Sequence, residues 1–228
     1  MSLQVRSRLG LADVVTLLNA VLGVVAMVGA VLGEVQLVAQ LILLAAVADG
    51  LDGIIARWRG GTDVGPLLDS IADIVSFGTA PALFVFVAAR EHGGTFLEEP
   101  ALVLVATAAA SIFVVFSLVR TALYTVYVGE DETRPGIQNT LAASILAAAY
   151  LAGFTYVPAL LAVTILLSVL MVAPVPYPKL LARDAFAMGV VQVGAIVAPM
   201  AFNRLFPRLL LVAALAYFLL APRYYWGE

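Results

Sequence analysis

The chain has 228 residues, of which 63% are apolar and 12% charged, and its mean hydropathy is +1.06; a soluble domain is about half apolar and a quarter charged, so this composition indicates an integral membrane protein. The net charge of −3 comes from fifteen acidic and twelve basic residues that are scattered, without the basic stripe that nucleic-acid binding requires. The absence of cysteine excludes disulfides, thiolate nucleophiles and cysteine-ligated metals, and with one histidine, His92, a histidine-based triad is difficult to build.

Eight apolar segments follow one another along the chain, each bounded by polar residues, glycine or proline. Because a transmembrane helix needs about 20 residues and backbone polar groups in hydrocarbon need internal partners, we expect helices. The predicted fold is an all-α integral membrane protein, a bundle of about eight transmembrane helices in one domain over residues 1–228. A six-helix core spans about 12–174, and a C-terminal pair is appended at about 180–222. The segments are 12–33, 35–58, 66–90, 100–128, 138–155, 157–173, 183–201 and 204–222.

The basic residues predict the orientation in the membrane. Eight spans place both termini on one side, and the positive-inside rule assigns the side richer in Lys and Arg to the cytoplasm. Arg6 and Arg8 could belong to a signal peptide, but the apolar run from Val14 to Leu32 has no small-x-small cleavage pattern, so we interpret it as a retained first span. We expect a multi-pass protein of the cell membrane with cytoplasmic termini. The basic residues on that side are Arg6, Arg8, Arg57, Arg59, Arg134, Lys179, Arg183 and Arg223.

Acidic residues inside the apolar segments are the main anomaly of this sequence. Each carboxylate in a transmembrane helix costs at least about 2.5–3.5 kcal/mol, so a group of four requires a positive partner. Asp49 and Asp52 are spaced i,i+3, and Asp69 and Asp73 are spaced i,i+4, so each pair shares one helix face. Oxygen ligands without Cys or His suit Mg²⁺, Mn²⁺ or Ca²⁺. The acids outside the expected loops and tails are Asp13, Asp49, Asp52, Asp69, Asp73 and Asp184.

Small residues lie between these acids. Gly50, Gly53 and Ala56 leave one helix face without bulk, so that a large or phosphorylated ligand could approach the backbone. The alternative for the glycines is close helix packing through small residues, which would not explain the acids. For one or two of the acids, the alternative is a protonated, hydrogen-bonded carboxyl group in the core.

The acids and small residues form a pattern that resembles a known family. The segment from Asp49 to Arg57, followed by Gly65 to Asp73, is similar to the CDP-alcohol phosphotransferase signature D-x-x-D-G-x-x-A-R-x8-G-x-x-x-D-x-x-x-D. Eight positions match in order. One departure is that seven residues, Trp58 to Val64, separate Arg57 from Gly65 where eight are usual.

The resemblance implies transfer of a substituted phosphate from a CDP-linked lipid to an alcohol, with release of CMP. It implies two divalent ions, Mg²⁺ or Mn²⁺, held by Asp49, Asp52 and Asp69, with Asp73 shared between metal binding and deprotonation of the alcohol. It also implies a homodimer, while the distribution of basic residues predicts that the active site lies on the cytoplasmic side. The resemblance implies that Gly53, Ala56 and Gly65 face the cytidine and that Arg57 faces the diphosphate. Gly50, on the helix face without bulk, is also expected to bind the CDP-lipid.

Further motifs resemble the phosphatidylserine and archaetidylserine synthase branch of the family. The run Ser76-Phe-Gly-Thr-Ala-Pro81 is similar to its S-F-G-x-A-P segment, and Thr16-Leu-Leu-Asn19 with Gly23 is similar to its first span. Two matches are partial. Ser117-Leu-Val-Arg120 keeps only the second arginine of an R-L-A-R segment, and Pro135-Gly-Ile-Gln-Asn139 resembles a G-L-P-x-P loop.

Arg120 is the basic residue near the expected active-site plane that the signature does not use. A serine carboxylate would pair with it bidentately, whereas the alternative is an arginine that snorkels to lipid headgroups. Ser76, Asn19 and Asn139 could donate hydrogen bonds to the acceptor or could serve packing and capping. Other possible acceptors are glycerol 3-phosphate, inositol phosphate and inositol, which would require more convergent basic residues for a phosphate. The alternative of another class is a cation transporter or channel, which would distribute its acids through the membrane depth.

Overall fold

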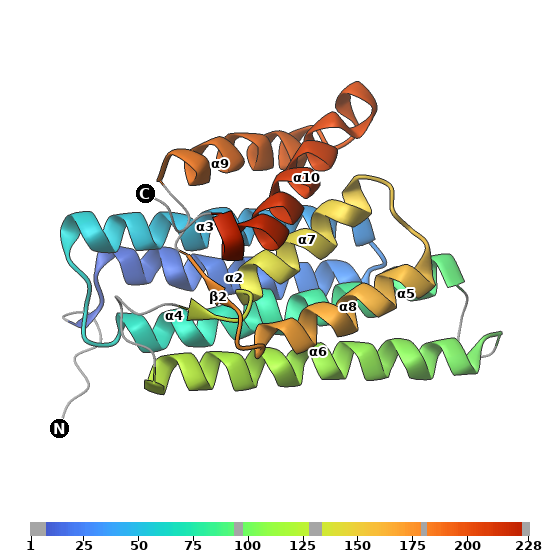
Figure 1. Ribbon diagram of the computed structural model, residues 1–228, viewed down its shortest axis with the longest axis horizontal. Helices are drawn as coiled ribbons and strands as arrows, with labels where there is room; N and C mark the ends of the chain where they lie inside the picture. Colours follow the sequence, from blue (N-terminus) through green and yellow to red (C-terminus); the bar gives the residue numbers. More distant parts are fainter. Residues whose placement is uncertain (1–7, 94–97, 128–133, 179–181, 225–228) are drawn as a thin grey trace.

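The structure is a bundle of helices in which the first described helix begins and the last one ends toward the same end (Figure 1). The computed structural model describes residues 8–93, 98–127, 134–178 and 182–224. The long helices of the first half of the chain run nearly parallel or antiparallel to one another. Two short strands, β1 (Arg134–Pro135) and β2 (Pro176–Tyr177), pair antiparallel. The helices are α2 (Leu11–Val31), α3 (Val35–Arg59), α4 (Gly65–Asp73), η1 (Ile74–Thr79), α5 (Ala80–Gly93), α6 (Pro100–Tyr127), α7 (Asn139–Leu151), α8 (Val157–Met171), α9 (Ala182–Val197) and α10 (Ala201–Tyr224).

The predicted helical membrane fold is confirmed, with differences in helix length. Five helical stretches are long and apolar enough to cross a membrane: α2, α3, the stretch Gly65–Gly93, α6 and α10. The other three, α7, α8 and α9, have 13, 15 and 16 residues. At about 1.5 Å per residue these measure about 20–24 Å, which is less than the hydrocarbon thickness of about 30 Å. The predicted apolar segments are longer than these helices because part of each segment forms a turn. One example is the turn after α7 at Gly153, whose φ is 100°.

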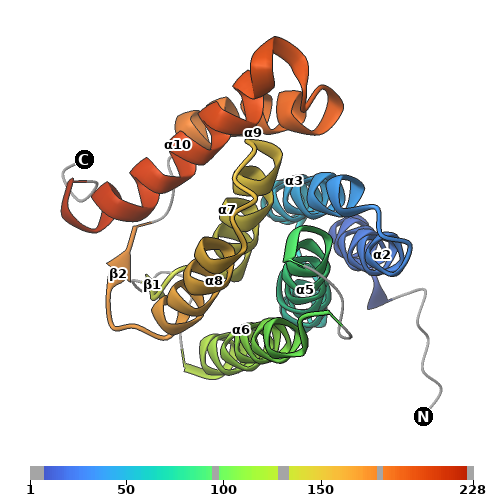
Figure 2. The same ribbon diagram turned by 90° about the vertical axis from the view of Figure 1, so that its right-hand side faces the viewer.

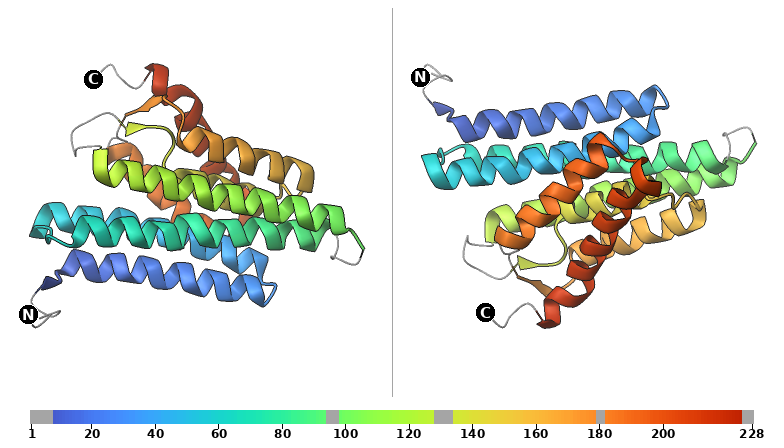
Figure 3. Two further views of the ribbon diagram at one scale, coloured as in Figure 1. Left: turned by 90° about the horizontal axis from the view of Figure 1, so that it is seen from below. Right: turned by 90° about the horizontal axis from the view of Figure 1, so that it is seen from above.

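The last two helices, α9 and α10, lie against one side of the helices that precede them. Figure 2 shows α9 and α10 beside α3 and α7, and Figure 3 shows them crossing the long helices obliquely. Two glutamine side chains form hydrogen bonds between α9 and α3. Gln40 Nε2 of α3 donates to the Ile196 carbonyl at 2.6 Å, and Gln192 Nε2 of α9 donates to the Leu43 carbonyl at 2.7 Å. A left-handed turn at Phe202 to Arg204 opens α10 and reverses the chain.

The third long stretch contains a π-helix that follows Asp73 directly. The α4 helix continues through η1 into α5, and the wider π turn falls on the Ser-Phe-Gly motif. Here helices approach each other closely: a Cβ atom on Gly23 of α2 would lie 2.8 Å from the Ser76 Cα atom, and one on Gly78 would lie 3.3 Å from the Ser117 Cβ atom. Glycine at these two positions lets α2 and α6 pack against η1, which sets the position of Asp73.

Candidate active site

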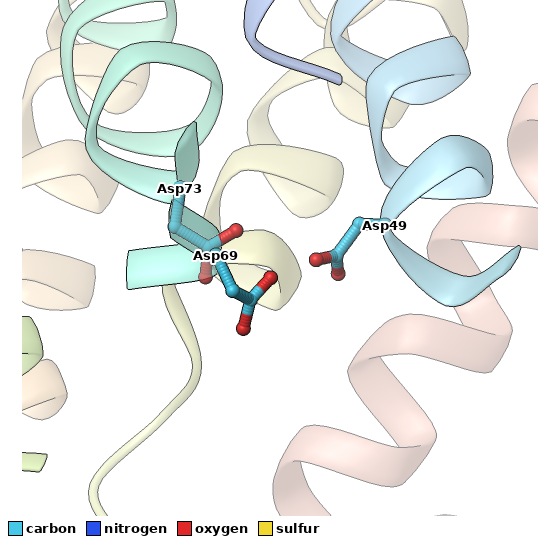
Figure 4. A group of neighbouring side chains, drawn as sticks. All are labelled: Asp49, Asp69 and Asp73. Carbon is cyan, nitrogen blue, oxygen red and sulfur yellow. The ribbon is translucent and has the colours of Figure 1, made fainter. Parts of the chain in front are cut away.

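Three of the predicted acids meet between α3 and α4. Asp49 from α3, and Asp69 and Asp73 from α4, each offer a carboxylate oxygen within 4.8 Å of the others, and all three side chains are partly buried (Figure 4). The i,i+4 spacing places Asp69 and Asp73 on one face of α4, which packs against α2 and α6, and Asp49 points toward them from α3. The result is a compact group of three carboxylates.

Asp52 is not part of this three-aspartate group, although the sequence pattern suggests four convergent acids. Its side chain is 6% exposed, and its Oδ2 atom accepts a hydrogen bond of 2.6 Å from Thr16 Oγ1 of α2. Asp52 still lies close enough to Asp49 for their charges to repel. Positions i and i+3 share a helix face but are offset by about 60° around the axis, and this offset lets Asp52 meet Thr16 of α2 while Asp49 points toward Asp69 and Asp73.

The donor set of the three-aspartate group fits a hard divalent cation. All the offered ligand atoms are carboxylate oxygens, which Mg²⁺, Mn²⁺ and Ca²⁺ prefer. The Oδ1 atom of Asp73 is buried and has no hydrogen-bond partner among the described residues. A buried carboxylate oxygen without a donor is costly, so a bound cation would stabilise this arrangement. Asp49, Asp69 and Asp73 could therefore hold a metal ion.

The small residues of the signature line α3 and the start of α4. A Cβ atom on Gly50 would meet no atom within 4 Å, and one on Gly53 would have the Arg57 guanidinium as its nearest neighbour at 3.5 Å. Space beside these glycines is therefore open, not filled by a packed helix, which favours the ligand interpretation over the packing one. Ala56 follows on the last turn of α3. A Cβ atom on Gly65, by contrast, would lie 3.1 Å from Asp13 Oδ1.

Arg120 of α6 lies beside the acids and is already engaged. It is 8% exposed, interacts electrostatically with Asp73, and its guanidinium carbon lies 4.2 Å from the Tyr124 ring centroid. The Tyr124 hydroxyl in turn donates to the Pro135 carbonyl at 2.9 Å. The burial of Arg120 and its contact with the Tyr124 ring argue against an arginine that snorkels to lipid headgroups. Arg120 supplies one positive charge near the buried acids.

Asn139 opens α7 next to Arg120. Its Nδ2 atom donates to Thr121 Oγ1 at 2.9 Å, and its buried Oδ1 atom has no hydrogen-bond partner among the described residues. The position of Asn139 depends on Gly136, three residues before it. Gly136 has a φ of 77°, in the left-handed region that favours glycine, and a Cβ atom there would overlap the Met171 carbonyl. This close approach lets the segment before α7 cross the end of α8.

Ser76 and Asn19 lie between η1 and α2. The Ser76 hydroxyl donates to the Asn19 carbonyl at 2.8 Å, and both side chains are fully buried. This hydrogen bond gives the Ser76 hydroxyl a role in the packing of η1 against α2. Both amide atoms of Asn19, Oδ1 and Nδ2, have no hydrogen-bond partner among the described residues.

Three residues at the site had no role in the sequence interpretation: Thr16, Asp13 and Tyr124. Thr16 belongs to a motif that resembles the family, and Asp13 is an acid at the start of a membrane span. The sequence therefore singled out both residues but did not show which residues they contact. Tyr124 lies four residues after Arg120, which is the spacing for side-chain contact along one helix face.

The chain also resembles known proteins across this region. Its sequence matches the CDP-alcohol phosphatidyltransferase family over residues 9–177. It is 29% identical over 180 residues to an archaetidylserine synthase of Methanothermobacter thermautotrophicus, which covers 77% of this chain and 72% of that protein. It is 37% identical over 83 residues to a CDP-diacylglycerol–serine O-phosphatidyltransferase of Methanocaldococcus jannaschii, covering 36% of this chain and 38% of that protein. For the enzyme of that name from Helicobacter pylori, the identity is 28% over 149 residues, covering 61% of this chain and 59% of that protein.

Proposed function

The chain belongs to the CDP-alcohol phosphatidyltransferase family, and we propose that it transfers a phosphatidyl-type group, diacylglycerol phosphate or archaeol phosphate, from a CDP-lipid to the hydroxyl of L-serine, releasing CMP. The observation that carries the proposal is the meeting of Asp49, Asp69 and Asp73 beside Arg120 in a membrane protein. The relatives whose names specify serine or archaetidylserine support this acceptor. An amphiphilic donor explains why a water-soluble alcohol needs a membrane-embedded enzyme.

The aspartates are proposed to hold two divalent ions, Mg²⁺ or Mn²⁺. Asp49, Asp52 and Asp69 are the proposed ligands, with Asp73 as a partial ligand. The oxygen-only donor set of the three-aspartate group and the buried Asp73 Oδ1 atom support this assignment. When bound, the ions neutralise charge on the diphosphate and make CMP a better leaving group.

The proposed donor site uses the open face of α3. Gly50, Gly53 and Ala56 admit the CDP moiety close to the backbone, Gly65 lies at the start of α4 opposite them, and Arg57 pairs with the diphosphate. The empty space around Gly50 supports this proposal, because a packing glycine would have a neighbouring helix in contact.

Asp73 is the proposed general base. The serine Oγ atom forms a bond to the lipid-bearing phosphorus, the bond from that phosphorus to the CMP oxygen breaks, and the hydroxyl proton passes to an Asp73 carboxylate oxygen. The proximity of Arg120 supports this role, because an acceptor whose carboxylate pairs with Arg120 would have its hydroxyl close to Asp73.

The proposed acceptor site lies between α6 and the start of α7. Arg120 pairs with the serine carboxylate, and Asn139 Oδ1, which is buried and still needs a donor, accepts a hydrogen bond from the serine ammonium. Asn19 of α2 and Ser76 of η1 are the other proposed acceptor residues; because the Ser76 hydroxyl already donates to the Asn19 carbonyl, Ser76 would offer its oxygen as a hydrogen-bond acceptor. A phosphate-bearing acceptor such as glycerol 3-phosphate would require several basic side chains around its phosphate, whereas one arginine is enough to pair with a single carboxylate.

The location follows from the same site. We propose that the enzyme resides in the cell membrane with its termini and active site facing the cytoplasm, where serine and CMP are soluble, and that it forms a homodimer. The close grouping of Asp49, Asp69 and Asp73 supports an enzyme over the cation transporter alternative, which would spread its acids through the membrane depth.

Release of CMP from a CDP-lipid by the purified enzyme tests the proposal. Ester-linked and ether-linked donors are each supplied with serine, ethanolamine, glycerol 3-phosphate or inositol, in Mg²⁺, in Mn²⁺ and in excess chelator. We expect CMP release and a serine-containing lipid only when serine and a divalent ion are both present. Turnover in excess chelator would overturn the metal assignment, and consumption of another acceptor in place of serine would overturn the acceptor assignment.

A further inference from the structure

A line of buried polar residues runs along one face of α2. The other faces of α2 expose apolar side chains, including Val14, Leu17 and Leu18, as expected beside lipid. The buried face carries Asp13 and Thr16, which are only 2% and 4% exposed. Polar residues buried in a transmembrane helix are costly unless they have partners, so their contacts indicate what this face is for.

The first contact is between Thr16 and Asp52. Thr16 Oγ1 lies 2.6 Å from Asp52 Oδ2 and 3.2 Å from the Ala12 carbonyl of its own helix. A hydroxyl has one proton, and the shorter contact to a carboxylate is the stronger hydrogen bond. The bond anchors the Oδ2 atom of Asp52, so the carboxylate is held in one orientation.

The second contact joins Asp13 to the segment between α3 and α4. Asp13 Oδ2 accepts hydrogen bonds from the Gly10 amide at 2.7 Å and from Thr62 Oγ1 at 2.8 Å. Thr62 Oγ1 in turn accepts a hydrogen bond from the Gly65 amide at 3.1 Å. Asp13 Oδ1 lies against Gly65, where a Cβ atom would be 3.1 Å away. The segment that is one residue shorter than in the family signature is therefore tied to α2 just before α4 begins.

We propose that α2 is the positioning helix of the donor half of the site, with Thr16 fixing the orientation of Asp52 and Asp13 fixing Gly65 through Thr62. The inference rests on the proposed function, because it takes Asp52 as a metal ligand and Gly65 as part of the donor site. Ligating carboxylates commonly need an outer hydrogen bond that sets their orientation, and loss of such a bond typically weakens metal affinity about 10- to 100-fold. Thr16 and Asp13 act through other residues and need not touch the substrate.

Binding of Mn²⁺ to the purified full-length enzyme without substrates, followed by electron paramagnetic resonance, tests the role of Thr16. Thr16→Val removes the hydroxyl at nearly constant volume, so we expect about 10- to 100-fold weaker Mn²⁺ binding. Thr16→Ser keeps the hydroxyl and should restore the affinity. The matched control is Thr164→Val, because Thr164 is also fully buried, but its hydroxyl donates to the Leu160 carbonyl of its own helix α8.

A double variant separates positioning from general damage. If Thr16 acts through Asp52, adding Thr16→Val to Asp52→Asn should weaken Mn²⁺ binding no further than Asp52→Asn alone. Wild-type Mn²⁺ affinity in Thr16→Val, or fully additive losses in the double variant, would overturn the inference. Asp49→Asn distinguishes this failure from failure of the proposed function: if Asp49→Asn also bound Mn²⁺ like the wild type, the metal site itself would be wrong.

The role of Asp13 is tested by CDP affinity, measured calorimetrically, and by the KM values for donor and serine. Asp13→Ala removes both hydrogen bonds, so we expect CDP affinity to fall about tenfold and the donor KM to rise, with the serine KM unchanged. Asp13→Asn keeps an oxygen that accepts from Gly10 and Thr62, and should recover most of the affinity. Equal increases in both KM values, or unchanged CDP affinity in Asp13→Ala, would overturn this part of the inference.

Discussion

The proposed acceptor site depends most on Arg120, so its removal is the sharpest test of serine as the substrate. The guanidinium is buried, lies 4.2 Å from the Tyr124 ring centroid and interacts with Asp73. Arg120→Ala removes the proposed partner of the serine carboxylate. It also removes a positive charge that acts on Asp73, so two separable effects are expected: weaker serine binding and slower turnover.

The size of the binding effect follows from the type of contact. A hydrogen bond to a charged group contributes about 1.5–3 kcal/mol, which corresponds to about a 10- to 100-fold increase in the KM for serine. Arg120→Lys keeps the charge but loses the planar fork that pairs bidentately with a carboxylate, so it should fall between the wild type and Arg120→Ala. The KM for the CDP-lipid should change little, because the proposed donor residues lie on α3 and α4.

Initial rates of CMP release at varied serine and fixed saturating donor measure this effect. Ethanolamine lacks only the carboxylate, so it should be a poor acceptor for the wild type and relatively less disfavoured by Arg120→Ala. Arg223→Ala is the control, because Arg223 is exposed and its guanidinium carbon lies over the Tyr224 ring at 5.8 Å, away from the acids. An unchanged serine KM in Arg120→Ala would refute the carboxylate pairing.

Three further predictions follow from the same geometry. Asp49→Asn and Asp69→Asn should each abolish CMP release while the protein inserts and purifies normally, because each removes one ligand charge from the shared group. Asp73→Asn should lower kcat more than donor affinity, and near-normal turnover would assign deprotonation elsewhere. Gly136→Ala should lower stability by about 1–3 kcal/mol in thermal unfolding, since alanine there is strained and overlaps a carbonyl of α8. Its control, Gly189→Ala, meets no atom within 4 Å and should be neutral or stabilising.

The membrane fold and the acidic signature could be predicted from the sequence because both depend on local patterns. Burial in hydrocarbon favours continuous apolar segments, so hydropathy alone separates the helices. The i,i+4 spacing of Asp69 and Asp73 specifies a shared helix face without any tertiary information. The preference of the site for hard divalent cations follows from residue type, because aspartates offer only carboxylate oxygens as metal ligands. The shorter lengths of α7 and α8 could not be predicted, because apolar residues in turns look the same as apolar residues in a helix.

Only the tertiary structure decided how the acids are divided and what surrounds them. Asp52 turns to Thr16, 36 positions earlier in the chain, while Asp49 meets Asp73 from another helix. Arg120 reaches Asp73 from α6, which gives the buried acids a positive neighbour. Such pairings depend on how closely helices approach, and that approach is set by packing between residues distant in sequence. A spacing rule along one helix carries no information about a partner on the next.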